Sequence, residues 1–195
     1  MTKPASFNAR AARNSHLRMV DSSGLPAENP GPLSLDEAYR RYAPYVATIA
    51  LRILGRSADL DDLVQDVFLD ATRGIASLTD PGAIKGWLAR IAVRASVRRL
   101  RRTRVLRALA LMPSQPPDFE SLASPDASPE QRALVARVYQ ALEALPATDR
   151  AAWVLRNVQG ETLEEAAELC ACSLSTLQRR LRRASAHIGQ ELPDV

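Results

Sequence analysis

Hydrophobic residues recur every three or four positions along most of the chain, which is the spacing of helices that bury one face. On this basis the sequence predicts three helices between Ser34 and residue 107 and four more near 129–145, 147–158, 163–170 and 174–188. No stretch alternates between apolar and polar residues in the manner of a β-strand. The pattern therefore predicts an all-α protein.

Two regions interrupt the helical pattern. Residues 1–33 are rich in Ser, Asn, Gly and Pro without any period, and they predict a disordered N-terminal tail. Residues 108–128 also lose the period while prolines accumulate, which predicts a flexible linker. The sequence therefore predicts two small helical domains, at 34–107 and at 129–190, joined by a flexible Pro-rich linker.

The charge is carried by arginine and is unevenly distributed. Of 26 basic residues only Lys3 and Lys85 are lysines, and the formal net charge is +4. Residues 85–107 hold nine basic side chains and no acid, whereas residues 113–130 hold four acids and no base. Because the arginine fork matches phosphate groups and base edges, this distribution predicts a polyanion-binding segment.

The helix expected from Asp80 onward carries that segment. Its arginines recur at helical spacing beside an apolar stripe, so they form one cationic ridge that a folded domain does not need for its own stability. Trp87 falls on the apolar face, and we expect it to pack in the core rather than to stack on a base. The ridge consists of Arg90, Arg94, Arg98 and Arg101 and is extended by Arg99, Arg102, Arg104 and Arg107.

The last two predicted helices resemble a helix-turn-helix. Thr162 and Glu165 form a capping box, and Ser173 caps the final helix after a short turn. The outward face of that helix is suited to the major groove, although a merely solvated arginine face is the alternative. Ala171 in the turn must either avoid a positive φ or bear strain. The outward side chains are Ser175, Thr176, Gln178, Arg179, Arg180, Arg182 and Arg183.

The second predicted helix is acidic and therefore unsuited to DNA. Its carboxylates are Asp59, Asp61, Asp62, Asp66 and Asp70. A surface of Asp62, Gln65 and Asp66 beside Leu63 fits a basic helical protein partner, and a solvated acidic face is again the alternative.

Several other function classes are excluded. The apolar stretches are too short for a membrane span and the N-terminus lacks the apolar core of a signal peptide, so we expect a cytoplasmic protein. Cys170 and Cys172 are expected to act as small buried hydrophobes rather than as metal ligands. No phosphate loop, catalytic triad or paired catalytic carboxylate is recognisable, so we expect no enzyme activity, cofactor or metal.

Several segments together resemble a known family. Residues 59–68 (DLDDLVQDVF), 87–92 (WLARIA) and 101–102 (RR) resemble domain two of the extracytoplasmic-function, or group four, sigma factors of bacterial RNA polymerase, in the sigma-70 superfamily. Residues 144–146 (ALP), 154–156 (VLR), 164–167 (EEAA) and 175–184 (STLQRRLRRA) are similar to their domain four. Both motif sets occur in the family's order.

The resemblance implies a role for each surface. The acidic helix would bind the clamp helices of the largest polymerase subunit, through Asp59, Asp62, Leu63, Gln65 and Asp66. The loop at 77–84 and the third helix would capture the separated strand of the minus-ten element, the helix through Arg90, Arg94, Arg98, Arg101 and Arg102. The final helix would read the minus-thirty-five element as duplex. Arg94 and Arg98 replace residues that are usual in the family, so no particular minus-ten base preference is implied.

The expected function is that of a sigma factor that binds core RNA polymerase and directs promoter recognition, promoter melting and transcription initiation. An autonomous helix-turn-helix regulator is the alternative, and a pure protein adaptor would leave the arginine ridge without a purpose. The expected partners are core polymerase and promoter DNA, as duplex and as melted strand. The resemblance adds an anti-sigma factor as a further partner that no single residue indicates.

Overall fold

The structure is a computed structural model that describes residues 34–75, 78, 80–111, 119 and 122–192. These residues form seven α-helices and one short 3₁₀ helix, and no strand occurs among them, which confirms the all-α prediction. The tail predicted at 1–33 lies outside the described residues. Within the described part of the chain, no helix is both long and apolar enough to cross a membrane.

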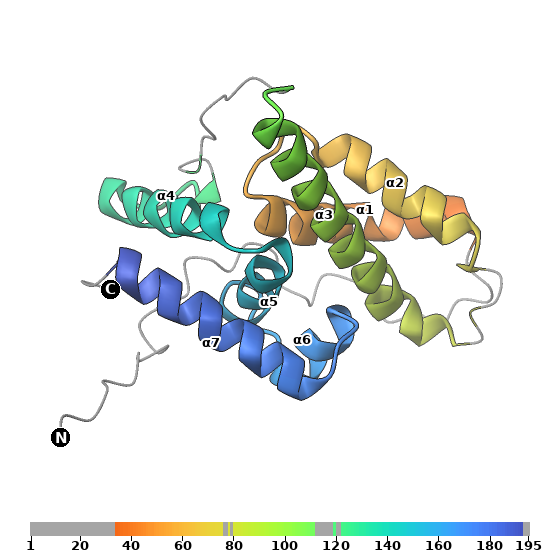
Figure 1. Cartoon of the computed structure of the whole chain (residues 1–195). Coiled ribbons are helices and arrows are strands. Elements are labelled where there is room, and N and C mark those ends of the chain that lie inside the picture. The colour runs from red at the N-terminus through yellow and green to blue at the C-terminus, as the bar shows by residue number, and fades with distance from the viewer. Residues whose placement is uncertain (1–33, 76–77, 79, 112–118, 120–121, 193–195) are drawn as a thin grey trace.

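The first helical unit comprises α1 (Leu35–Leu54), α2 (Leu60–Thr72), η4 (Pro81–Ala83) and α3 (Ile84–Ala108). Each of the three α-helices packs against the other two, and α3 crosses α1 and α2 in Figure 1. Ser34 begins α1 through the capping box that it forms with Glu37. The helix expected from Asp80 onward is preceded by a 3₁₀ turn, and α3 itself begins at Ile84. Trp87 packs partly buried against the core, as its spacing predicted.

The second helical unit comprises α4 (Pro129–Ala144), α5 (Ala147–Asn157), α6 (Leu163–Leu169) and α7 (Leu174–Glu191). Side chains of Ser128, Thr162 and Ser173 accept hydrogen bonds from backbone N–H groups at the starts of α4, α6 and α7. These bonds satisfy donors that a helix start otherwise leaves unpaired. Helix α5 lies inside the unit and packs against α6 and α7.

A buried ion pair joins α5 to α7 within this second unit. Asp149 is 1% exposed. Arg183 reaches it from α7 and donates from Nε to one carboxylate oxygen at 3.0 Å and from Nη2 to the other at 2.9 Å. This bidentate geometry compensates the carboxylate for the water that it loses on burial.

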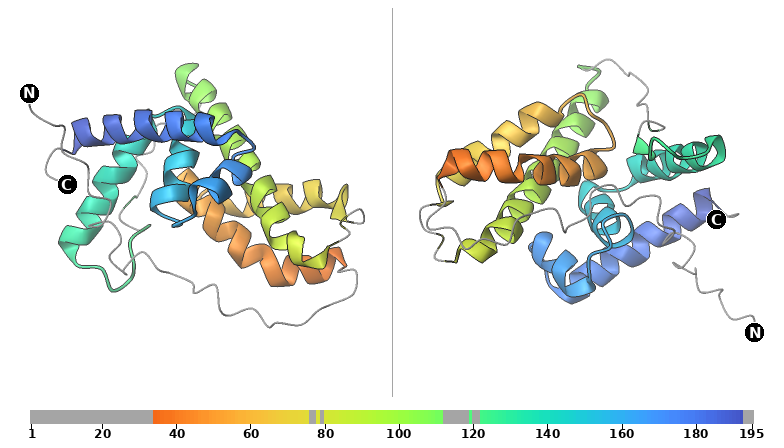
Figure 2. Two further views of the ribbon diagram at one scale, coloured as in Figure 1. Left: turned by 90° about the horizontal axis from the view of Figure 1, so that it is seen from below. Right: turned by 180° about the vertical axis from the view of Figure 1, so that it is seen from behind.

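The two helical units lie against each other rather than apart. Helix α5 contacts both α1 and α3, and α6 contacts α3, as the views of Figures 1 and 2 show. The segment predicted to be a free linker is anchored at Phe119, which is 7% exposed and stacks on Tyr139 with ring centroids 5.8 Å apart. The predicted linker therefore contributes one buried aromatic ring, which packs against Tyr139 of α4.

We predict that Arg183→Met will destabilise the second helical unit by about 2 kcal/mol, because the buried carboxylate of Asp149 loses its bidentate donor. Chemical denaturation followed by circular dichroism measures the loss. Arg182→Met is the matched control, since Arg182 is exposed and no ion pair of its side chain occurs among the described residues. Equal stability of the two variants would contradict a structural role for this ion pair.

Candidate nucleic-acid interface

Arginines form one exposed ridge along α3. Arg94, Arg98, Arg101 and Arg102 are exposed, and Arg90 is half-buried, with Nη1 3.9 Å from a carboxylate oxygen of Glu168. No acid lies on α3, so every carboxylate partner of its arginines comes from another part of the chain. Arg98 pairs with Asp70 at 3.5 Å, whereas Arg94 and Arg101 make no ion pair within the described residues. The ridge therefore offers unpaired guanidinium groups to an external anion.

The predicted extension of the ridge is largely wrong, because three of its four arginines bind within the protein. Arg99 pairs with Asp59 at 3.3 Å and lies 3.9 Å from Asp66. Arg104 donates to the backbone carbonyls of Ala144 and Leu145, and Arg107 pairs with Glu143 at 3.1 Å. Only Arg102 remains exposed without such a partner among the described residues.

A tight turn between α6 and α7 completes the predicted helix-turn-helix. Ala171 adopts φ +48°, so the chain takes the strained alternative. Its left-handed conformation costs a non-glycine residue about 1–2 kcal/mol. The turn is held by hydrogen bonds from the N–H of Ala171 to the carbonyl of Glu168 and from the N–H of Cys172 to the carbonyl of Ala167, both 3.0 Å.

Fewer side chains of α7 are free on its outward side than the sequence predicted. Thr176 and Arg180 are half-buried, and Arg183 is held by Asp149. Leu177, Ala184 and Ile188 face the core. The remaining predicted side chains are all exposed and form what we call the recognition face, which consists of Ser175, Gln178, Arg179 and Arg182.

The acidic helix α2 borders a groove of about 490 Å³ that it shares with α3. Asp62 and Gln65 are exposed on its wall, while Leu63 is 1% exposed and supports the wall from below. Leu63 is therefore not placed to touch a partner, because its spacing marks the core face of the helix. The lining includes Asp59, Asp62, Gln65, Asp66, Leu69, Arg99, Arg102 and Leu106.

Sequence reasoning missed Leu69 on this groove. Leu69 is 64% exposed and lies four residues after Gln65, so helical spacing places it on the same face of α2. The sequence signal that would have identified Leu69 is a leucine at helical spacing from the acidic residues, on the polar face of the helix. The groove thus combines carboxylates with apolar lining from Leu69 and Leu106, a combination that suits an amphipathic basic helix.

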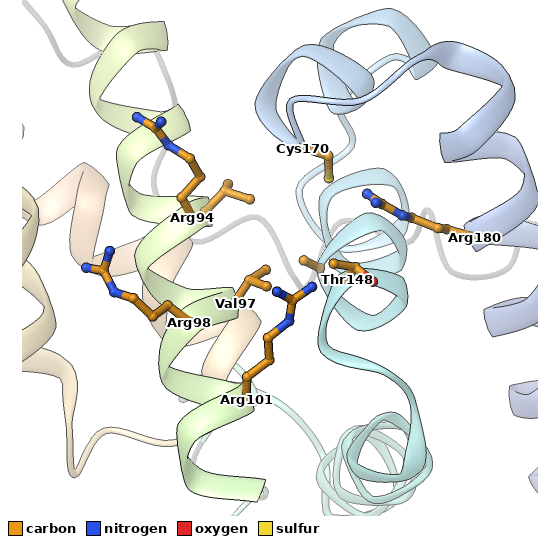
Figure 3. A pocket seen from close by; sticks show the side chains of 9 residues that line it. Arg94, Val97, Arg98, Arg101, Thr148, Cys170 and Arg180 are labelled. Carbon is orange, nitrogen blue, oxygen red and sulfur yellow. The ribbon is translucent and has the colours of Figure 1, made fainter. Parts of the chain in front are cut away.

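A cavity of about 360 Å³ separates the arginine ridge from the second helical unit. In Figure 3, Arg101 and Arg180 extend into this space near Thr148, whereas Arg94 and Arg98 turn away from it. Thr148 lies in the first turn of α5, and Cys170 lies at the end of α6. The cavity therefore lies between α3 and the second helical unit, and Arg101 and Arg180 reach into it from the two units.

Cys170, which lines this cavity, and Cys172 are both free and half-buried. Burial, with a smaller effect from Cys172, raises the pKa of Cys170 to about 12, so its thiol stays protonated near neutral pH. No group of three or more His, Cys, Asp or Glu side chains within the described ranges is placed to hold a metal ion.

Each of the two helical units matches a known protein family. Residues 38–105 match the family described as Sigma-70 region 2, and residues 136–188 match Sigma-70, region 4. These matches coincide with α1 to α3 and with α4 to α7, so each helical unit corresponds to one family.

Individual proteins give the same result. The chain is 33% identical over 169 residues to the ECF RNA polymerase sigma factor SigE of Mycolicibacterium smegmatis, a match that covers 85% of this chain and 63% of SigE. It is 32% identical to the ECF RNA polymerase sigma factor SigM of Mycobacterium tuberculosis, over 82% of this chain and 77% of SigM.

The fold is also similar to that of the sigma factor RpoE of Bartonella quintana, solved with the anti-sigma factor NepR, at a TM-score of 0.56 and 23% identity, over 82% of this chain and 96% of RpoE. That similarity concerns the fold alone. Since the family matches and the sequence relatives agree on both halves of the chain, this protein belongs to the ECF sigma factors of the sigma-70 family.

Proposed function

We propose that this protein is a dissociable specificity subunit of RNA polymerase, which binds the core enzyme and directs promoter recognition, promoter melting and transcription initiation. The observation that carries the proposal is the order of its surfaces: an acidic groove and an arginine ridge on the first unit, then a recognition face on the second. SigE and SigM, both named RNA polymerase sigma factors, match the chain across both units.

The groove between α2 and α3 is the proposed docking site for core polymerase. Asp62 and Gln65 stand exposed on its wall, and Leu69 supplies apolar area beside them. Ion pairs with Arg56 and Arg99 fix the carboxylate of Asp59 at one end of the groove. A basic helix of the polymerase clamp would meet a pre-arranged set of acceptors, which reduces the entropy lost on binding.

The arginine ridge of α3 is the proposed contact for the separated strand of the minus-ten element. Arg94 and Arg101 have no ion-pair partner among the described residues, and Arg90, Arg98 and Arg102 flank them. A melted strand presents its phosphates on a flexible backbone, so a line of guanidinium groups can follow it. The ridge thereby stabilises the open form of the promoter relative to the duplex.

The recognition face of α7 is the proposed reader of the minus-thirty-five element. A second helix of a helix-turn-helix enters the major groove, where its first residues reach base edges. Gln178 and Arg179 lie one turn into α7 and are both exposed. Their side chains are donors suited to adenine and to guanine or a phosphate, respectively.

The protein acts by binding and contributes no catalytic group or cofactor in this proposal, and it works in the cytoplasm with the polymerase. RpoE of Bartonella quintana was solved with an anti-sigma factor. A partner of that class would compete with polymerase if it covered the groove of α2 and α3, and we include it among the proposed partners.

We predict that Asp62→Arg will weaken binding to core polymerase about tenfold, which corresponds to about 1.4 kcal/mol, because it reverses a charge on the docking groove. Fluorescence anisotropy of the labelled protein titrated with core enzyme measures the affinity. Asp61→Arg is the matched control, since Asp61 is exposed on the same helix but does not line the groove. The docking site is misplaced if the two variants bind alike.

We predict that replacing Gln178 and Arg179 with alanine will reduce discrimination at the minus-thirty-five element by about 1–3 kcal/mol for each bidentate hydrogen-bonded pair with a base that the replacement removes. Preference at the minus-ten element should not change. The measurement is transcription from a randomised promoter library by polymerase carrying the variant. Arg137→Ala on α4 is the control, because Arg137 is exposed and lies outside the helix-turn-helix.

We predict that replacing Arg94 and Arg101 together with alanine will affect the minus-ten element and leave the minus-thirty-five preference unchanged. This double variant should impair promoter opening and lower the slope of log affinity against log salt by about one for each phosphate that is no longer neutralised. Binding to a minus-ten single strand over a salt series measures the slope. A changed minus-thirty-five preference with an unchanged slope would contradict the assignment of α3 to the melted strand.

A further inference from the structure

A further cavity lies between the C-terminal half of α3 and the helices α4 and α5. It holds about 620 Å³, a volume typical of pockets that bind small molecules. Five arginines line it, and Glu143 is the only acid among the described residues of its lining. The cavity is therefore positive overall and suited to an anionic ligand. Its arginines are Arg56, Arg101, Arg104, Arg107 and Arg150.

Most of this charge is not neutralised by the protein. Arg107 pairs with Glu143 at 3.1 Å, and Arg56 pairs with Asp59 at 2.8 Å. The other three arginines pair with no carboxylate among the described residues, so three positive charges of the lining remain available to a ligand. They are Arg101, Arg104 and Arg150.

The charge of Arg150 is buried at the wall of the cavity. Arg150 is 4% exposed, and its Nε and Nη2 atoms donate to the carbonyls of Ile53 and Leu54 at 2.8 and 2.7 Å. Gly55 makes this approach possible, because a Cβ atom there would lie 2.5 Å from Nη2. Both acceptors are neutral, so the guanidinium has hydrogen bonds but no counter-ion. Burial lowers its pKa to about 10, and it therefore stays charged near neutral pH.

The guanidinium of Arg56 lacks one hydrogen-bond acceptor. Its Nε atom is buried and has no acceptor among the described residues, whereas its Nη2 atom bonds to Thr103 and Asp59. A buried donor without an acceptor costs free energy. An anion nearby would compensate the guanidinium electrostatically for this missing bond.

The start of α5 adds uncharged donors to the cavity. Side chains of Ser or Thr cap α4, α6 and α7, whereas Pro146 precedes α5 and provides no side-chain hydrogen bond. The first N–H groups of α5, those of Ala147 and Thr148, have no acceptor among the described residues, and both residues line the cavity. Free N–H groups at the positive end of a helix attract anions, phosphate groups among them.

This uncapped helix start faces an arginine of α3. In Figure 3, Arg101 extends toward Thr148, and both residues line this cavity as well as the cavity of about 360 Å³ shown there. A phosphate group between them would meet a guanidinium on one side and helix N–H groups on the other. Charged and backbone donors of this kind bind phosphate well together.

Apolar side chains form much of the remaining lining. Phe119 is 7% exposed and stacks on Tyr139, whose ring centre lies 6.0 Å from the Arg150 guanidinium. Both rings also lie against Gly55, where a Cβ atom would be 2.8 and 3.2 Å from them. Apolar area beside convergent charges suits an organic molecule that carries several phosphates better than an inorganic ion. The larger apolar members of the lining are Leu54, Leu100, Phe119, Leu145 and Pro146.

We propose that this cavity, which we call the arginine pocket, binds an organic polyphosphate of about the size of a nucleoside triphosphate. Its phosphate chain lies between Arg101, Arg104 and the start of α5, and its organic part lies against the apolar lining. The pocket is formed by contacts within the chain alone, so it is independent of the proposed function.

Isothermal titration calorimetry of the full chain with ATP and with GTP tests the arginine pocket. We expect at least one of these nucleotides to bind once per chain with a dissociation constant of about 100 µM or tighter. Tripolyphosphate, which carries the phosphate chain alone, should bind at least about fivefold more weakly, because it leaves the apolar lining uncovered. Equally tight binding of tripolyphosphate would overturn the organic part of the ligand, and no binding by either nucleotide would overturn the pocket.

Arg101→Gln separates the arginine pocket from general attraction to the arginine ridge. Arg102→Gln is the matched control, because Arg102 is the exposed neighbour on α3 but lines the groove of α2 instead of the pocket. We expect nucleotide affinity to fall at least about fivefold for Arg101→Gln and to stay within about twofold of wild type for Arg102→Gln, since only Arg101 donates to the phosphates. Equal losses would show that charge along α3 holds the nucleotide, and the pocket would then be wrong.

Thr148→Glu tests the start of α5 with a variant that should stay folded. A carboxylate in the first turn stabilises a helix, but at this position it also repels phosphate from the pocket. Ser175→Glu is the control, because Ser175 is likewise the second residue of its helix, α7, and lies outside the pocket. We expect at least about tenfold weaker nucleotide binding for Thr148→Glu alone, with circular dichroism reporting the helical content of both variants. Wild-type affinity in a folded Thr148→Glu variant would rule out binding at the start of α5.

Discussion

The position of one guanidinium group decides how the two helical units of this sigma factor are placed relative to each other. Arg150 supplies two of the three hydrogen bonds that the end of α1 takes from the second unit, and Tyr139 supplies the third. Because α5 is held there, α6 and α7 lie opposite α3. The distance between the two proposed DNA-binding helices is thus set by the ending of a helix that contacts no DNA in the proposed function.

The use of arginine for nearly every cationic position has a structural reason. Arg150, Arg104 and Arg183 each donate two hydrogen bonds from a planar fork, which a lysine ammonium cannot reproduce with the same geometry. The same residue type therefore serves internal bonding and external anions. Which role an arginine takes depends on whether an acceptor from another helix lies within reach, as it does for Arg104 and does not for Arg94.

This dependence explains what the sequence could and could not predict. Helix positions and the capping residues Ser34, Thr162 and Ser173 follow from local spacing, and the structure agrees with them. The internal roles of Arg183 and Arg104 were missed, because their acceptors lie 34 and about 40 residues away in the chain. Phe119 was missed for the same reason: its partner Tyr139 lies beyond the prolines that predicted a free linker.

Gly55 places an evolutionary constraint on the chain. Because glycine has no side chain, there is room beside it for the Arg150 guanidinium and the rings of Tyr139 and Phe119. A larger residue at position 55 would break this contact, and the other three residues would then no longer be selected for it. Descendants of this sequence should therefore retain or lose these four residues as a set, although they lie on four separate segments of the chain.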